Sequence, residues 1–260
     1  EADEAEAPSP RTVYEQDELE APPPTTTARE SLVFPPIASI GMAYTLSFIF
    51  LAFGLLNAPG KPLPNILVIL VDDMGYGDLK SYNPDSRIPT PHLDKLAHEG
   101  LRFTDAHAPG PLCHLSRYGL MTGRYPFRAN TGAWRNQPSI KAGQTTIASL
   151  LRAQGYHTSM VGKWHLGFEE NGYDKPLPGG PVDVGFETFF GIRASTDIPP
   201  YFYIRGNRAV SEPTERIASN YSTGWSRIQG AFWRAGGISP DLKLEDVLPR
   251  FTEEALRKIN

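Results

Sequence analysis

The 260-residue chain has one cysteine, Cys113, and no lysine-rich or arginine-rich stripe. A single cysteine has no partner for an intramolecular disulfide, so its thiol is either an ordinary buried group or a chemically special one. Nucleic-acid binding needs a concentrated basic surface, and we therefore expect no nucleic-acid partner. The sequence also shows no internal repeat.

Charge is distributed unevenly along the chain. Residues 1–30 carry nine acids and two arginines, a net charge of −7, which leaves +3 for the other 230 residues of a chain whose total is −4. The mildly basic net charge of residues 31–260 is compatible with a small anionic substrate. Residues 1–36 combine these acids with proline and threonine tracts, and we predict that this acidic segment is disordered because it is too polar to collapse.

Residues 37–56 form an uncharged hydrophobic run of 20 residues. This is about the ~20 residues that a helix needs to cross a bilayer. Two interpretations stay open: a membrane anchor behind an acidic tail, or an export signal that begins at Met42. Either one places the globular part outside the cytoplasm. The protein would then be periplasmic, secreted or located in a lysosome-like compartment.

Residues 65–71 are continuously apolar and rich in β-branched side chains. The run predicts a strand buried on both faces, as in a parallel sheet covered by helices. Asp72 and Asp73 follow it directly, and ligands gather beyond the carboxyl ends of such strands. Two adjacent carboxylates oppose each other's ionisation, so we expect a cation or hydrogen-bond donors beside them.

The remaining pattern alternates between strands and helices. Proline at the first helical position, capping residues and terminal glycines mark the helices, and short apolar runs mark the strands. We predict helices over 91–99, 145–154 and 249–259, and strands over 101–106, 156–162 and 187–190. The fold class is therefore α/β, a three-layer α/β/α sandwich over residues 64–260 with a central, mostly parallel or mixed sheet.

The single cysteine opens the segment Cys-His-Leu-Ser-Arg, residues 113–117. Ser116 to Met121 predicts a helix, which puts Cys113 at or just before its N-terminus. Free backbone N–H groups and the positive end of the helix dipole favour an anion there. Arg117 adds a rigid fork of donors that suits a tetrahedral oxyanion.

Several separated blocks together resemble a known family. They are NILVILVDDMGYGD, TPHLDKLAHEG, CHLSRYGLMTGRYP, TTIASLLRAQGYHTSMVGKWHLG and DVGFETFFG, spread over roughly residues 64–210. In this order and spacing they resemble the type I sulfatases, of the arylsulfatase A kind in the alkaline phosphatase superfamily. The resemblance implies a sulfuric ester hydrolase that cleaves sulfate monoesters in a small molecule or a glycan.

The resemblance also implies roles for four residues. Cys113 takes the place of the cysteine that a formylglycine-generating enzyme oxidises to formylglycine, whose hydrated aldehyde attacks sulfur. Arg117 would hold the formylglycine. Lys163 and His165 match the pair that touches the sulfate and the hydrated aldehyde.

A calcium ion is implied in the same way. Asp72 and Asp73 match the first pair of calcium ligands, with the residue formed from Cys113 as a further ligand, and carboxylate oxygens suit this hard cation. Substrate contacts are implied for Lys163 and Ser195.

The chain departs from the family pattern at two points. In the signature C-x-P-x-R, Leu115 stands where the family has proline. We therefore expect the oxidation of Cys113 to be less efficient. The downstream calcium pair, leaving-group histidine and second lysine of the family are not found before Asn260. We therefore expect an N-terminal fragment that is inactive alone and binds calcium weakly.

Two other functions stay open. A phosphoesterase or phosphonate hydrolase of the same superfamily would use the same aspartates, although a threonine or serine at position 113 would favour phosphoryl transfer. A non-catalytic sulfatase-like module that binds sulfated glycans would be compatible with Leu115.

Overall fold

The computed structural model describes residues 63–221 and 232–260. The chain divides into Glu1–Leu67 and Val68–Asn260, and the elements below belong to the second unit. The predicted disordered segment and the hydrophobic run 37–56 lie outside the described residues. Within the described ranges, no helix combines the length and the apolar composition that crossing a bilayer requires.

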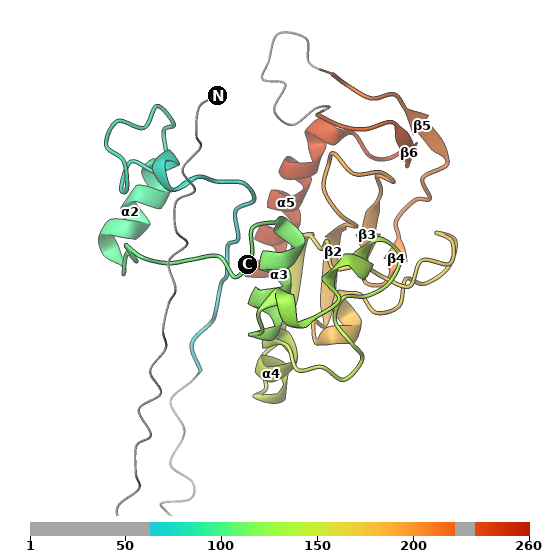
Figure 1. The fold of residues 1–260 in the computed structure, drawn as a ribbon, viewed down its shortest axis with the longest axis horizontal. Coiled ribbons are helices and arrows are strands. Elements are labelled where there is room, and N and C mark those ends of the chain that lie inside the picture. The colour runs from blue at the N-terminus through green and yellow to red at the C-terminus, as the bar shows by residue number, and fades with distance from the viewer. Residues whose placement is uncertain (1–62, 222–231) are drawn as a thin grey trace, which may run out of the picture. The chain divides into compact units, whose positions relative to one another are not determined.

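The strands form one mixed sheet and one small separate sheet (Figure 1). In the order β1-β2-β3-β4, β1 is parallel to β2, and β2, β3 and β4 are successively antiparallel. The smaller sheet is an antiparallel pair, β5 and β6. The bounds are β1 Ser159–Lys163, β2 Thr188–Ile192, β3 Tyr203–Arg205, β4 Arg208–Ala209, β5 Glu215–Ile217 and β6 Gly236–Ile238.

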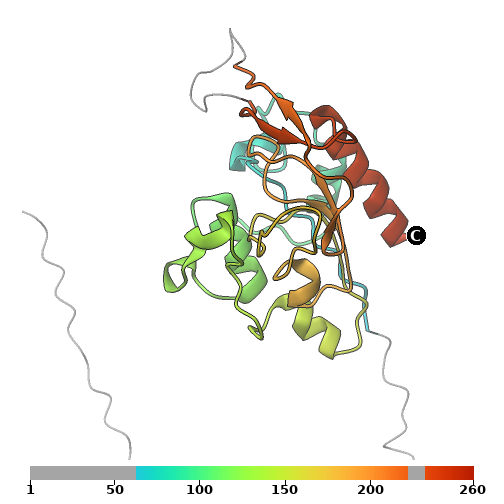
Figure 2. The ribbon, with the colours of Figure 1, turned by 90° about the vertical axis from the view of Figure 1, so that its right-hand side faces the viewer.

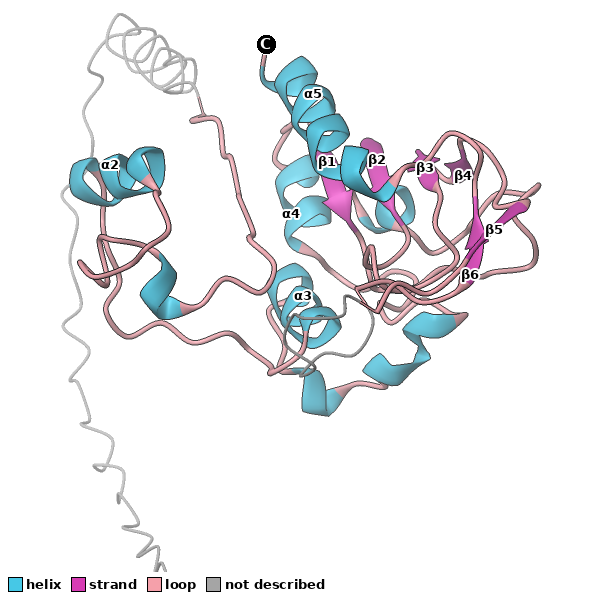
Figure 3. Cartoon of the chain, turned by 90° about the horizontal axis from the view of Figure 1, so that it is seen from above, coloured by secondary structure: helices cyan, strands magenta, loops and turns pink. Residues whose placement is uncertain are grey.

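Four α-helices and several short 3-10 helices accompany these sheets in the described ranges (Figure 3). The α-helices are α2 Pro91–Glu99, α3 Cys113–Thr122, α4 Ile147–Ala153 and α5 Val247–Ile259. The 3-10 helices are η1 Tyr76–Asp78, η2 Pro126–Arg128, η3 Thr131–Arg135, η4 Pro181–Val184 and η6 Leu244–Asp246. Local sequence explains their ends: Thr146 caps α4 by accepting a hydrogen bond from the Ser149 N–H at 3.0 Å, and α3 ends at Gly123, whose φ is +64°.

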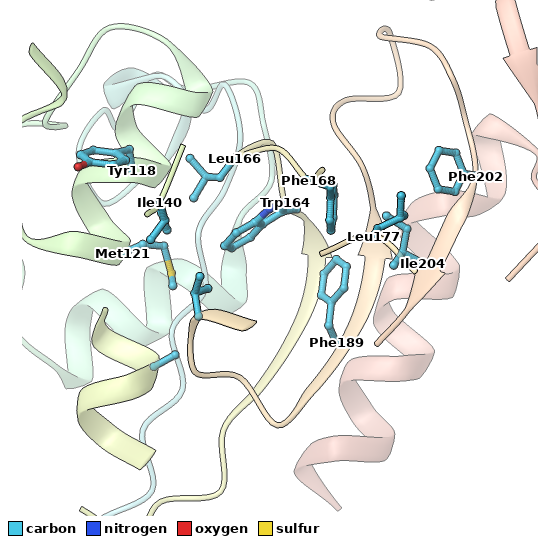
Figure 4. Packing of buried hydrophobic residues seen from close by; sticks show 12 residues of the cluster. Tyr118, Met121, Ile140, Trp164, Leu166, Phe168, Leu177, Phe189, Phe202 and Ile204 are labelled. Carbon is cyan, nitrogen blue, oxygen red and sulfur yellow. The ribbon is translucent and has the colours of Figure 1, made fainter. Parts of the chain in front are cut away.

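The central sheet has a hydrophobic core on each face, because successive side chains of a strand point to opposite faces. Phe189 of β2 joins the core that contains Tyr118 and Met121 of α3 (Figure 4). Phe190, the next residue, joins the other core, with Val247 of α5. In Figure 2, α5 is the dark red helix that ends at the C-terminus. The α/β/α fold class is thus confirmed.

Two of the predicted strands are wrong. Residues 65–71 and 101–106 have no strand assignment, and the apolar side chains of Ile66 through Val71 are 46–67% exposed. A strand exists only when a neighbour completes its hydrogen-bond ladder, and apolar composition does not supply that neighbour. No strand in the described ranges pairs with either segment.

The other predicted elements are confirmed with small shifts of their ends. The helices predicted over 91–99, 145–154 and 249–259 correspond to α2, α4 and α5, and the strands predicted over 156–162 and 187–190 to β1 and β2. The helix predicted after Cys113 is α3. The domain limits themselves, 64–260 included, remain a prediction.

Candidate active site

Cys113 is the first residue of α3 and is half-buried. The preceding turn is fixed by Ser116, whose hydroxyl donates to the Gly110 carbonyl at 2.7 Å. The N–H groups of the first helical turn have no intrahelical acceptors, so the sulfur lies at the positive end of the helix dipole. Its Sγ atom is 3.3 Å from Nδ1 of His165, a residue 52 positions later in the chain.

The segment after β1 brings a lysine and this histidine to the same place. β1 ends at Lys163, and the backbone then stays beside the end of β2 through hydrogen bonds from the Trp164 N–H to Ile192 at 3.1 Å and from the His165 N–H to Arg193 at 3.0 Å. His165 has a φ of +59°, which is uncommon for a residue other than glycine. Trp164, 1% exposed, anchors the turn in the core.

Arg117 connects three parts of the site. Its Nη1 donates to the Lys163 carbonyl at 2.7 Å, and its Nη2 lies 3.4 Å from a carboxylate oxygen of Asp72. The third guanidinium nitrogen, Nε, is buried and has no hydrogen-bond partner among the described residues. Arg117 therefore retains one donor that faces no protein acceptor there.

The two aspartates differ in their surroundings. Asp72 also forms an ion pair with the Lys163 ammonium group. Burial alone raises the pKa of Asp72, but the hydrogen bond and charge of Lys163, together with Arg117, outweigh burial and hold the pKa below its ordinary value. Asp73 is exposed with a φ of +59°, and within the described ranges no group bonds to its carboxylate.

His165 is the most strongly perturbed base of the site. Burial, followed by the charges of Lys163, His114 and Arg117, lowers its pKa to about 3. The imidazole is therefore neutral at pH 7. The Trp134 ring packs edge-on against it, with ring centroids 4.2 Å apart, and no partner for its buried Nε2 atom exists among the described residues.

His114, which has no role predicted from the sequence, belongs to the same group. Its ring centroid is 5.5 Å from that of His165, and burial, then the charges of Arg135 and Lys163, lower its pKa. Trp134 was also missed. Adjacency to Cys113 was the only sequence signal for His114, and Trp134 had none.

Ser195, like Asp73, is a predicted site residue that this cluster does not include. It lines a small cavity with Ile192, Leu242 and Val247. No hydrogen bond joins it to Cys113 or Lys163 in the described part of the chain. Its contact with substrate stays a prediction.

Comparison with known proteins adds an independent finding. The family model described as Sulfatase matches residues 64–230. An N-acetylgalactosamine-6-O-sulfatase of Bacteroides thetaiotaomicron is 34% identical over 193 residues, which cover 72% of this chain and 37% of that protein. Arylsulfatase A of Bos taurus is 46% identical over 141 residues, which cover 53% of this chain and 27% of that protein.

A solved structure is similar as well. It comes from work on the metabolism of multiple glycosaminoglycans by Bacteroides thetaiotaomicron. The two structures superpose with a TM-score of 0.61 at 29% sequence identity, and the match covers 72% of this chain and 46% of that one. The chain spans about a third of the length of the curated relatives it matches.

Proposed function

This chain belongs to the sulfatase family, and on that premise we propose that the protein hydrolyses sulfate monoesters. The observation that carries the proposal is the 3.3 Å approach of the Cys113 sulfur to His165, beside the Lys163, Arg117 and Asp72 group. The sequence resemblance gives each of these residues a role in the same reaction.

Position 113 would carry the nucleophile. We propose that the formylglycine-generating enzyme converts Cys113 to formylglycine, whose hydrate supplies a hydroxyl group for attack on sulfur. His165 is neutral at pH 7 because of its low pKa, so its Nδ1 can accept a hydrogen bond or a proton from the group at position 113. Arg117 and the N-terminus of α3 supply positive potential for a sulfate oxygen.

Lys163, the last residue of β1, is the proposed sulfate contact. Its ammonium group forms an ion pair with Asp72. A sulfate that binds here therefore competes with the Asp72 carboxylate for the N–H donors of Lys163. Ser195 remains a proposed substrate contact.

A calcium ion fits the acidic pair by donor type. Asp72 and Asp73 offer hard carboxylate oxygens, and Ca²⁺ takes about 6–8 oxygen ligands, so this pair supplies only part of a complete set. The group formed from Cys113 is the proposed third ligand. When bound, the ion would supply positive charge to the sulfate oxygens.

The names of the relatives support a proposed substrate class. Relatives carry the names N-acetylgalactosamine-6-O-sulfatase and arylsulfatase A, and we propose a sulfated small molecule or glycan as substrate. We also propose export from the cytoplasm, with residues 37–56 as a signal or a membrane anchor.

The test begins with mass spectrometry of the tryptic peptide that contains Cys113. Protein made together with the formylglycine-generating enzyme should carry the aldehyde at position 113, and Cys113→Ala provides the control without it. A completely unmodified thiol would contradict the enzymatic proposal and favour the non-catalytic module. Faster cleavage of an aryl phosphate than of the matching aryl sulfate would favour the phosphoesterase.

A further inference from the structure

We propose that Cys113, His114 and His165 form a binding site for a thiophilic divalent cation, Zn²⁺ or a metal of similar preference, while Cys113 is still a thiol. Each residue offers one ligand atom, and the three atoms lie within 4.8 Å of one another. Cys113 and His114 come from the first turn of α3, and His165 follows β1.

The spacing is close to that of a metal centre. Tetrahedral zinc holds sulfur at about 2.3 Å and imidazole nitrogen at about 2.0–2.1 Å, which puts these two ligand atoms about 3.5 Å apart. The observed distance from the Cys113 Sγ to the His165 Nδ1 is 3.3 Å. Side-chain rotations would have to close the remaining separations, which reach up to 4.8 Å, onto one ion.

The ligand types select a different metal from the aspartate pair. Thiolate and imidazole suit zinc and similar transition metals, whereas carboxylate and water suit calcium. Neutral imidazoles have a lone pair free for a metal.

The local charges act on a bound cation in both directions. Lys163 and Arg117 are close by and oppose a cation, and the Asp72 carboxylate, which pairs with both, offsets part of their charge. Loss of the Cys113 proton on binding adds a further negative charge beside the ion.

The inference does not depend on the proposed sulfatase function. Conversion of Cys113 to formylglycine removes the sulfur, so the metal-loaded form and the converted form exclude each other. If both proposals hold, a bound Zn²⁺ ion keeps the protein in its unconverted state.

Cobalt titration tests the site. The 260-residue chain is made without the formylglycine-generating enzyme, the free thiol is verified by mass, and Co²⁺ is added. We expect one equivalent to bind, with thiolate-to-cobalt charge-transfer absorption and the visible bands of tetrahedral cobalt. Zn²⁺ should displace it, and an excess of Ca²⁺ should not.

Variants make the result specific. Cys113→Ser should abolish the charge-transfer band, and His114→Ala should weaken binding by at least the ~10–100-fold that loss of an outer-shell partner costs. His92→Ala is the matched control, because His92 is exposed on α2. Circular dichroism checks that each variant is folded. Absence of cobalt binding, or binding unchanged in both Cys113→Ser and His114→Ala, would overturn the proposal without affecting the formylglycine test.

Discussion

The Arg117 guanidinium on α3 donates a hydrogen bond to the main-chain carbonyl of Lys163, with 2.7 Å between Nη1 and the oxygen. The same side chain lies 3.4 Å from the Asp72 carboxylate. One arginine therefore fixes the beginning of a helix, the end of a strand and the acidic turn relative to one another. This arrangement makes it a sensitive position for mutation.

Replacing Arg117 by lysine should destabilise the protein. A lysine has one point charge in place of a rigid fork and cannot make both contacts. We expect the free energy of unfolding to fall by about 1–3 kcal/mol, the usual cost of a broken hydrogen bond to a charged group. Urea denaturation measures it, with Arg124→Lys, at an exposed position, as the control. Equal stability of the two variants would contradict the bracing role of Arg117.

Replacing Leu115 by proline should raise the fraction of Cys113 converted to formylglycine. Leu115 is the third residue of α3, where the backbone N–H has no intrahelical acceptor and proline is tolerated. The change restores the C-x-P-x-R signature. Mass spectrometry of the Cys113 peptide gives the fraction, and Leu115→Ala removes the leucine without restoring the proline. An equal fraction in both variants would show that Leu115 does not limit conversion.

Replacing Trp134 by alanine should loosen the surroundings of His165. Trp134 is 7% exposed and packs against the imidazole with centroids 4.2 Å apart. We expect a loss of about 3–5 kcal/mol of stability. The pKa of His165 should rise toward its ordinary value, because burial is the main cause of its depression.

Thermal unfolding and histidine NMR titration measure these two effects. Phe127, 78% exposed, provides the control Phe127→Ala, which should change stability by less than about 0.5 kcal/mol. A His165 pKa that stays near 3 in Trp134→Ala would rule out a role of Trp134 in burying the imidazole.

Glu254 should contribute a pH-dependent part of the stability. The hydrogen bond from Arg205, 2.6 Å long at its shorter contact, holds the pKa of Glu254 below its ordinary value of 4.5 against the opposing effect of burial. The folded state therefore binds this proton less readily than the unfolded state. Its contribution is complete above about pH 4.5 and is lost as the pH falls through the lower folded pKa.

The variant Glu254→Gln should accordingly lose about 1–3 kcal/mol at pH 7 and progressively less in acid. Glu253→Gln is the matched control: its ion pair with Arg257 is exposed and 3.6 Å long, and such pairs contribute about 0–1 kcal/mol. Urea denaturation at several pH values separates the two. A loss for Glu254→Gln that does not depend on pH would contradict the assignment.

The sequence predicted those elements whose signals are local. Pro91 at the start of α2 and the glycines that follow α2 and α4, Gly100 and Gly155, each mark a helix end through their own chemistry. The strands β3 and β4 have only three and two residues, too few for a periodic pattern. The run at 65–71 misled the prediction because composition reports apolarity and not the neighbour that a strand requires.

The same distinction applies to the site. The motif around Cys113 and the one around Lys163 were visible separately, and the contact between them is tertiary. His114 gains its significance only because His165, 51 residues later, returns to its side. A site that forms only when distant segments pack together cannot be recognised from the linear sequence pattern.

The order of the main sheet has a practical outcome. β1 is an outer strand with one hydrogen-bonded neighbour in the described ranges, so its other backbone edge is a template that a foreign strand can use. The uncovered apolar stretch at 66–71 is the kind of sequence that such a template captures. Concentrated solutions of this chain should therefore self-associate through intermolecular β-pairing.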